Sequence, residues 1–296
     1  MRIRAFITHK LCEDYSSCQD YYNIDIDNRC ICLCDGMSQS IFPDYWAQIV
    51  SKHFVKNFDL TEESRLVLCS EWRSRVEKYI QSEIVKGENP WRIQSNLEEG
   101  YSAGCTICSL KVSKHNDWEG KVLGDSCIIV FHKENNTIEI LSSEEKAFDS
   151  YPDFVDSNPK NLGRGQIKTF EGILNESTCI LLVSDPFSEF LRLHSNDAEK
   201  YLYQICALDS HEKFLSLVQE WRNIGMHNDD SSLVIIEFDN NSEININHFD
   251  SLEELSISEL KDNEKEQHFL TPSDSVYKTI KNLSELFRQN ARLCVE

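Results

Sequence analysis

The sequence predicts an α+β fold in which two antiparallel sheets are flanked by helices. Strand patterns open the chain, two helical patterns follow, and strands return before a second helical region and a last strand. This order does not alternate strand with helix, as a parallel doubly wound sheet would require. With 296 residues and 40% hydrophobic content, the chain can bury a substantial core.

Two strand patterns fill the N-terminal region. Residues 2–8 form the first, and residues 21–34 are rich in β-branched, aromatic and cysteine residues on both sides of a turn at Asp27-Asn28. Two such runs around a short polar turn predict a β-hairpin.

Helices are predicted after Pro43, where apolar residues recur at helical spacing. Their aromatic stripes are typical of helix faces that pack on a core, not of a cofactor-binding surface. The stripe residues are Trp46, Ile49, Val50, Phe54 and Phe58 in the first helix, and Trp72, Val76, Tyr79, Ile80 and Ile84 in the second.

The remaining part of the predicted domain places strands on both sides of a second helical region. The expected elements are a meander of strands at 103–112, 121–132 and 136–142, a polar stretch at 143–165, strands at 166–172 and 178–184, helices within 186–224 and a strand at 232–238. These patterns place one domain at residues 1–238.

The composition changes after residue 238. Residues 239–272 are rich in Asp, Glu, Asn and Ser, which predicts a mobile acidic linker or appendage. A C-terminal helix is expected at 273–296, where Val276, Ile280 and Leu283 begin an apolar stripe. Such a helix could dock on the domain or bind a partner.

The chain is strongly acidic, with 50 Asp and Glu against 30 Lys and Arg and a formal charge of −20. This charge repels nucleic acid and anionic lipid, so neither nucleic acid nor a membrane is an expected partner. The first residues lack the apolar core of a signal peptide, and no run approaches the roughly 18 apolar residues of a membrane span. We therefore expect a soluble, cytoplasmic protein.

The twelve cysteines do not predict a disulfide framework. Cys30, Cys32 and Cys34 alternate within a predicted strand, which is typical of small buried hydrophobic residues. Reduced thiols are therefore expected. Cys105 and Cys108 form a lone C-x-x-C without a second pair, so they do not indicate a zinc site.

Four short acidic motifs stand where predicted strands begin or end. They are Glu13-Asp14, Asp35-Gly36, Ser184-Asp185 and Asn228-Asp229-Asp230. Any one of them alone is more often a plain turn. If the strands pair, however, several carboxylates converge on one sheet rim, and hard divalent cations bind such clusters of oxygen ligands.

Two further motifs, Gly104-Cys105-Thr106 and Gly124-Asp125-Ser126, lie between the second and the third. The ordered set resembles the metal-dependent serine/threonine protein phosphatases of type 2C over about residues 1–238. The resemblance implies an α/β/β/α sandwich and the hydrolysis of phosphoserine and phosphothreonine in proteins by a metal-bridged hydroxide. The implied cofactors are two Mn²⁺ or Mg²⁺ ions, with a third when one binds.

The resemblance also implies a role for each aspartate and for one glycine. The predicted catalytic residues are Asp35, Asp185 and Asp229. In the implied metal site, Asp35 bridges both ions and the Gly36 carbonyl ligates one of them. Asp185 and Asp229 hold the second ion. Asp14 acts through metal-bound water, and Asp125 contributes to the weaker third ion. The alternative to a metal-binding role for Asp14, Asp125 and Asp229 is that they are solvated turn residues at strand ends.

The chain departs from the family motifs at several positions. The glycines that follow Asp-Gly in many members are absent, and Met37 stands where some members have a histidine general acid. Pro186 replaces a glycine, and proline removes a backbone N–H. His9 falls on the position of a phosphate-binding arginine, and Lys10 is adjacent. These two are the predicted substrate-binding residues, although neither offers arginine's bidentate fork.

Three functions are compatible with these motifs. The first is an active phosphatase, whose expected partners are a phosphoprotein substrate and, as a second candidate, a cognate protein kinase. The second is a non-catalytic pseudophosphatase that acts as a phosphoprotein-binding or scaffold module. The third is a metal-dependent hydrolase of another phosphoester. The intact carboxylate set favours the first, whereas the missing glycines and arginine favour the second.

Overall fold

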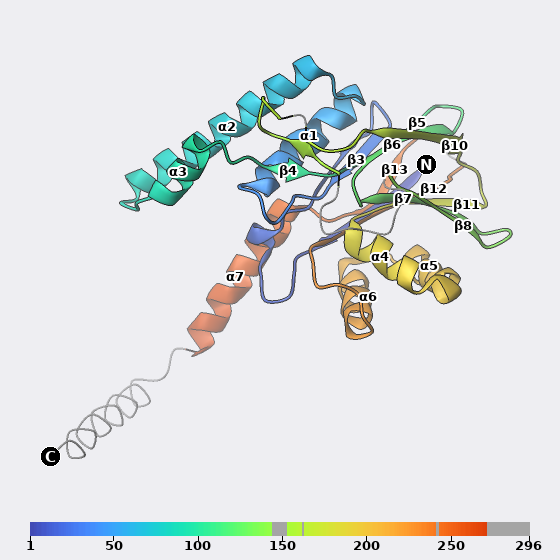
Figure 1. The fold of residues 1–296 in the computed structure, drawn as a ribbon. Coiled ribbons are helices and arrows are strands. Elements are labelled where there is room, and N and C mark those ends of the chain that lie inside the picture. The colour runs from blue at the N-terminus through green and yellow to red at the C-terminus, as the bar shows by residue number, and fades with distance from the viewer. Residues whose placement is uncertain (144–152, 162, 241–242, 271–296) are drawn as a thin grey trace. The chain divides into compact units, whose positions relative to one another are not determined.

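The computed structural model describes residues 1–143, 153–161, 163–240 and 243–270 (Figure 1). One compact unit comprises Met1–Leu252, and a second begins at Glu253. The helix expected at 273–296 lies outside the described residues. Among the described residues, no helix combines the length and the apolar character needed to cross a membrane.

The first sheet of the Met1–Leu252 unit has six strands in the order β13-β1-β12-β11-β7-β8. Neighbouring strands are antiparallel except β1 and β13, which are parallel. The strands are β1 (Arg2–Thr8), β7 (Cys127–His132), β8 (Thr137–Leu141), β11 (Thr178–Val183), β12 (Ser231–Glu237) and β13 (Asn245–Phe249).

The second sheet has five antiparallel strands in the order β10-β6-β5-β3-β2. They are β2 (Tyr21–Asp25), β3 (Cys30–Cys34), β5 (Ile107–Val112), β6 (Asp117–Leu123) and β10 (Lys168–Ile173). The hairpin expected within 21–34 is confirmed as β2 and β3. Two short strands, β4 (Gly104–Cys105) and β9 (Val155–Asp156), pair with each other.

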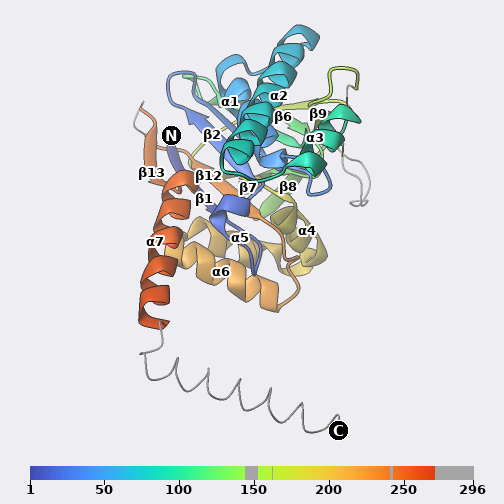
Figure 2. The same ribbon diagram turned by 90° about the vertical axis from the view of Figure 1, so that its left-hand side faces the viewer.

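Helices cover the outer faces of the two sheets (Figure 2). On the five-stranded sheet, one hydrophobic core joins the alternating cysteines of β3 to α1 (Pro43–Asn57), α2 (Glu62–Val85) and α3 (Trp91–Glu98). On the six-stranded sheet, a second core joins β7, β11 and β12 to α4 (Asp185–Leu193), α5 (Ala198–Cys206) and α6 (His211–Asn223). The predicted aromatic stripe of α1 lies wholly in the first core, as do Trp72, Val76 and Ile80 of α2. Ile84, near the end of the α2 stripe, is exposed and lies outside the core.

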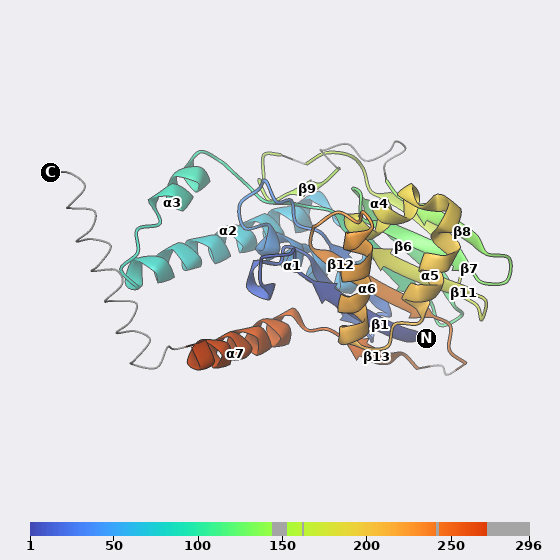
Figure 3. The same cartoon turned by 90° about the horizontal axis from the view of Figure 1, so that it is seen from below.

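The two sheets pack face to face between these helical layers (Figure 1), and Figure 3 shows the sandwich from the side covered by α4, α5 and α6. Gly120 of β6 faces β7 so closely that an added Cβ would lie 2.4 Å from Cδ1 of Ile128. Alternate residues of β11, Ile180 and Leu182, are fully buried on the face opposite the helices. The architecture therefore confirms the expected α/β/β/α sandwich of two sheets flanked by helices.

The single strand expected at 121–132 is wrong. β6 ends at Leu123 in one sheet, and β7 begins at Cys127 in the other. The chain crosses between sheets at Gly124, whose φ of +97° favours glycine. This crossing places Asp125 at the rim of the sandwich, instead of inside a strand.

Regular structure extends beyond residue 238, into the segment expected to be a linker. The amide of Asn245 donates to the carbonyl of Met1 (2.8 Å), and the amide of Asp250 donates to that of Ala5 (3.0 Å), so β13 extends the first sheet. These backbone bonds need no apolar run, which is why composition alone did not predict the strand. Helix α7 (Leu252–Leu270) follows, with Glu253 and Glu254 in its first turn.

Candidate metal centre

Strand pairing brings the acidic motifs to one end of the sandwich. In the five-stranded sheet, Tyr21 of β2 pairs with Cys34 of β3. The residue before Tyr21 is Asp20 and the residue after Cys34 is Asp35, so these two aspartates are neighbours. The hairpin register alone therefore creates the first pair of carboxylates.

The six-stranded sheet contributes the other carboxylates at the same end. Val183 at the end of β11 pairs with Leu233 of β12 on one side and with Cys127 of β7 on the other. Asp185 follows β11, Asp229 precedes β12 and Asp125 precedes β7. Three strand ends thus place three aspartates next to one another, facing the pair from the second sheet.

The pKa values of the cluster show its mutual repulsion. Burial raises the pKa of Asp35 well above its usual range, and the charges of Asp20, Asp185, Asp125 and Asp229 raise it further. Burial and the charge of Asp125 likewise raise the pKa of Asp185. Burial and the charge of Asp230 raise the pKa of Asp20 to about 8.

Asp20 is the most deeply buried of these aspartates, with 1% of its surface exposed. Neither of its carboxylate oxygens makes a well-formed hydrogen bond among the described residues, although the hydroxyls of Ser232 and Ser184 lie near enough to lower its pKa. Buried acceptors in native proteins are normally satisfied, and several adjacent carboxylates call for a cation. Asp35 and Asp185 stay partly exposed, which leaves the cluster open to a cation from solvent.

The structure does not bring Asp14, the predicted outer metal residue, into this cluster. Its side chain is exposed and begins a short 3-10 helix, Tyr15–Ser17. Its carboxylate accepts from Ser16 Oγ at 2.6 Å and from the amide of Ser17 at 3.1 Å. These bonds lower the pKa of Asp14, the hydrogen bond from Ser16 contributing most. Asp14 is thus a helix cap, whereas Asp20 lies within the aspartate cluster.

The two glycine-containing motifs between the acidic ones support Asp35. The amide of Asp35 donates to Thr106 Oγ1 at 3.1 Å, and that hydroxyl lies 2.7 Å from Ser126 Oγ. The amide of Thr106 in turn donates to the carbonyl of Asp35 at 2.9 Å. These buried hydroxyls therefore fix the backbone that carries the central carboxylate.

Gly36 is required by a close approach of two chain segments. A Cβ at this position would lie 2.8 Å from the carbonyl oxygen of Gln19 and 2.9 Å from Cβ of Pro43. The absence of a side chain lets the Gln19-Asp20 segment lie against Asp35. The loop after Gly36 is held by backbone bonds, because the amide of Met37 donates to the carbonyl of Gly104 at 2.9 Å.

Asp230 organises the backbone around the cluster. Its carboxylate accepts from the amide of Lys10 at 3.0 Å and from the amide of Gln19 at 2.8 Å. It is 3% exposed, and burial raises its pKa. Asp230 therefore joins the end of β1 to the segment that carries Asp20.

Of the two predicted substrate-binding residues, Lys10 lies at the cluster. Its Nζ is 2.9 Å from Oδ1 of Asp229 and donates to Ser38 Oγ, also at 2.9 Å. The ring of His9 packs edge-on against Tyr15 at 4.6 Å between centroids, with Nδ1 2.7 Å from the Lys10 carbonyl.

Sequence reasoning missed Asp20, Asp230 and Arg222. Arg222, on α6, donates to the carbonyls of His9 (3.1 Å) and Asp229 (2.7 Å) and so holds two strand ends together. The hairpin pattern could have identified Asp20, because the residue before its first strand must lie beside the residue after its second. Arg222 had no comparable signal, because it acts on backbone atoms distant in sequence.

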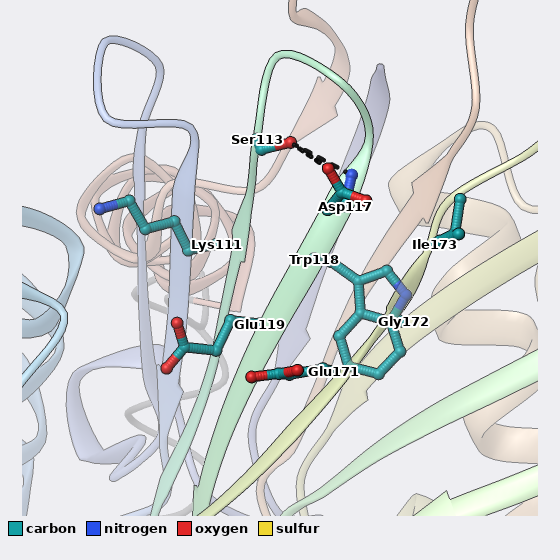
Figure 4. Close-up of a pocket in the computed structure, with 8 residues that line it drawn as sticks. All are labelled: Lys111, Ser113, Asp117, Trp118, Glu119, Glu171, Gly172 and Ile173. Atoms are coloured by element: carbon teal, nitrogen blue, oxygen red, sulfur yellow. Dashed lines mark hydrogen bonds between the residues drawn. The ribbon is translucent and has the colours of Figure 1, made fainter.

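A surface groove of about 610 Å³ lies apart from this centre (Figure 4). It is formed by β5, β6 and β10. Its lining residues are Lys111, Ser113, Asp117, Trp118, Glu119, Glu171, Gly172 and Ile173. None of the clustered aspartates lines it, so the acidic centre remains the candidate site.

Bacterial serine/threonine phosphatases of known structure are similar to this chain. A variant of a bacterial serine phosphatase has a TM-score of 0.50 at 16% identity, covering 80% of this chain and 98% of its own. The serine/threonine phosphatase of S. agalactiae has a TM-score of 0.52 at 13% identity, and the match covers 80% of this chain and 99% of that chain. PppA, a regulatory component of T6SS in Pseudomonas aeruginosa, has a TM-score of 0.50 at 14% identity, and the match covers 80% of this chain and 97% of that chain.

No family model and no curated protein sequence matches the chain. The structural similarity nevertheless covers nearly the whole length of each phosphatase. The fold of this chain is therefore the fold of these bacterial serine/threonine phosphatases.

Proposed function

We propose that this protein is a metal-dependent phosphatase that removes phosphate from phosphoserine and phosphothreonine in proteins. The observation that carries the proposal is the convergence of five aspartates at one end of the paired sheets. These are Asp20, Asp35, Asp125, Asp185 and Asp229. The fold shared with bacterial serine/threonine phosphatases supports the same function.

The donor set fits hard divalent cations. All five side chains offer oxygen, which Mg²⁺ and Mn²⁺ prefer, and none of the clustered ligands is a thiolate or an imidazole. Two such ions, when bound, would neutralise the phosphoryl oxygens and activate a water molecule. Asp35, with Asp20 and Asp185 on either side, is the central ligand in this proposal. Asp229 would hold the second ion and Asp125 a weaker third.

Other residues of the chain position the ligands and the substrate. Thr106 and Ser126 fix the backbone of Asp35, and the Gly36 carbonyl is a further proposed ligand. Lys10 provides a positive charge beside the cluster, which suits a phosphoryl oxygen. Its four-carbon stem allows the ammonium to leave Asp229 when a cation takes its place.

A non-catalytic phosphoprotein-binding module is the second candidate. Two observations favour it: Lys10 already pairs with Asp229, and Met37, which follows Gly36, cannot donate a proton to a leaving group. Such a protein would bind the phosphorylated partner through the same centre without turning it over.

The test is hydrolysis of a phosphothreonine peptide by metal-free protein titrated with Mn²⁺ or Mg²⁺. Turnover that requires the added metal, and that Asp35→Asn and Asp185→Asn each reduce by at least about a thousandfold, would support the phosphatase. Asp197→Asn, at the exposed start of α5, is the matched control. Metal binding without turnover over a range of pH would instead support the binding module.

A further inference from the structure

A pair of thiols lies at the end of the six-stranded sheet remote from the aspartates. Cys179 is near the start of β11, and Cys206 ends α5. Their sulfur atoms are 3.5 Å apart. Cys179 is completely buried, whereas Cys206 keeps part of its surface exposed.

The surroundings of the pair favour a thiolate on Cys206. The hydrogen bond with Cys179 lowers the pKa of Cys206, and the charges of Lys133 and Arg4 add to this shift. Burial and the charge of Glu237 oppose it, but the pKa is lowered on balance. The same hydrogen bond, together with burial, raises the pKa of Cys179. Loss of a proton is therefore favoured at the accessible sulfur over the buried one.

Another close thiol pair among the described residues lacks these features. The sulfur atoms of Cys32 and Cys34 are 3.8 Å apart. Both residues have no exposed surface, and burial raises both pKa values well above the usual range. Buried neutral thiols of this kind are inert, so proximity alone does not make a reactive pair.

Metal binding is a less suitable role for the Cys179–Cys206 pair. Ligand atoms of Cys179, Cys206 and Glu237 lie within 4.8 Å of one another. However, the Glu237 carboxylate already contacts Arg2 at 2.5 Å, Arg4 at 2.6 Å and Lys133 at 2.7 Å. A metal cation would have to replace three positive side chains, whereas a thiolate gains from them.

We propose that Cys206 is a modification site for low-molecular-weight disulfides such as glutathione disulfide, and that Cys179 resolves the product. The Cys206 thiolate attacks one sulfur of the disulfide R–S–S–R, which forms a mixed disulfide and releases RS⁻, which takes up a proton. Cys179 then loses its proton, attacks the Cys206 sulfur and releases a second RSH. The protein loses two electrons, and the small disulfide gains them.

The product would be a covalent link between α5 and β11, across residues that are 27 positions apart. The resting protein would contain both thiols reduced, as the sequence predicts. The reaction involves neither the clustered aspartates nor a phosphorylated substrate, so it is independent of the proposed phosphatase activity.

The test treats native full-length protein with glutathione disulfide, blocks the remaining thiols with an alkylating reagent and maps the peptides by mass spectrometry. Wild type should yield a Cys179–Cys206 linkage that dithiothreitol reverses. Cys206→Ser should lose the linkage completely. Cys179→Ser should instead accumulate one glutathione on Cys206, a trapped intermediate that a merely structural pair would not give.

Cys12→Ser is the matched control, because Cys12 is exposed and belongs to a different segment. This variant should form the linkage to the same extent as wild type. The proposal fails if Cys179 and Cys206 both remain open to alkylation while Cys12 becomes glutathionylated. It also fails if the purified protein holds stoichiometric zinc that Cys206→Ser abolishes, since the pair would then be a metal site.

Discussion

The ammonium of Lys10 lies 2.9 Å from a carboxylate oxygen of Asp229, one of the aspartates proposed to bind metal. Lys10 is mostly buried, with 14% of its side chain exposed, and its Nζ is also 4.0 Å from Asp230. Burial on its own lowers the pKa of Lys10, but the hydrogen bond and the charge of Asp229 outweigh it, so the pKa is raised. Lys10 is therefore a permanent cation that would compete with the proposed metal for Asp229.

Replacing Lys10 should tighten metal binding. Lys10→Gln removes an ion pair worth about 1 kcal/mol, which corresponds to roughly fivefold in the dissociation constant of Mn²⁺. Calorimetric titration of metal-free protein measures this constant and the stoichiometry. Lys52→Gln, on the exposed face of α1, should leave both unchanged. Unaltered or weaker Mn²⁺ binding by Lys10→Gln would show that the two cations do not compete.

Asp20, and not Asp14, should be needed for stabilisation by metal. A cation that binds only the folded protein raises the melting temperature, because binding adds to the free energy of unfolding. Asp20→Asn should remove most of the Mn²⁺-dependent increase. Asp14→Asn should retain it and leave the melting temperature nearly unchanged with and without Mn²⁺, because asparagine caps a helix about as well as aspartate does. The reverse result would restore the residue that the sequence pattern favoured.

The raised pKa of Asp20 predicts how the stability of the metal-free protein changes with pH. The ordinary pKa of 3.8 rises to about 8 on folding, so the folded state holds this proton more tightly than the unfolded state. The contribution of protonated Asp20 to the free energy of unfolding is complete below about pH 4 and is lost as the pH rises toward about 8. Denaturant unfolding in the presence of a chelator should therefore show stability falling from pH 5 to pH 8.

Two comparisons test the origin of this dependence. Asp20→Asn should flatten the slope, because the amide does not titrate. Saturating Mn²⁺ should also flatten it in the wild type, because metal binding releases the proton. Equal slopes in wild type and Asp20→Asn would assign the pH dependence to other groups.

The sandwich could be predicted from the sequence because its elements follow local patterns. The hairpin of β2 and β3, the aromatic stripes of α1 and α2, and the apolar runs of β11 and β12 each reflect residues close in the chain. Asp35 and Asp185 were found because each directly follows such an element, whereas Asp125 and Asp229 were found through the ordered motifs. The break at Gly124 was missed, because apolar residues continue on both sides of it.

The details of the centre depend on long-range contacts that composition does not encode. Asp14 matched the Glu-Asp motif in the sequence. The pairing of Tyr21 with Cys34, however, places Asp20 beside Asp35. Pro186, which replaces a glycine of the family motif, lies in the first turn of α4, where proline is favoured. A proline in that first turn therefore leaves Asp185 in place.

Glu237 should contribute strongly to stability through its charge. It is 6% exposed and accepts from Arg2, Arg4 and Lys133. Burial on its own raises the pKa of Glu237, but these cations outweigh it and the pKa is lowered. Glu237→Gln should reduce the free energy of unfolding by about 3 kcal/mol, because Arg4 is left buried without its counter-charge.

The contribution of Glu237 should depend on pH in the opposite sense to that of Asp20. A lowered pKa stabilises the protein above the ordinary pKa of 4.5, and this stabilisation is lost as the pH falls through the folded-state value. Wild type should thus lose more stability in acid than Glu237→Gln. Glu77→Gln, whose partner is the exposed Arg73, should change stability by less than about 0.5 kcal/mol. Similar acid profiles for wild type and Glu237→Gln would contradict this account.

Substrate affinity should depend on Lys10 more than on His9. The ring of His9 packs against Tyr15 and its Nδ1 lies at the Lys10 carbonyl, whereas the Lys10 ammonium lies at the aspartates. At saturating Mn²⁺, Lys10→Gln should raise KM for a phosphothreonine peptide by roughly tenfold, because one charge-assisted hydrogen bond is worth about 1.5 kcal/mol or more. Lys10→Arg should retain or lower KM, since guanidinium binds a phosphoryl group through two donors. His9→Gln should change KM less than Lys10→Gln. If His9→Gln has the larger effect, His9 contacts the phosphate, as its match to the family's arginine position suggests. The role of Lys10 is then limited to its pairing with Asp229.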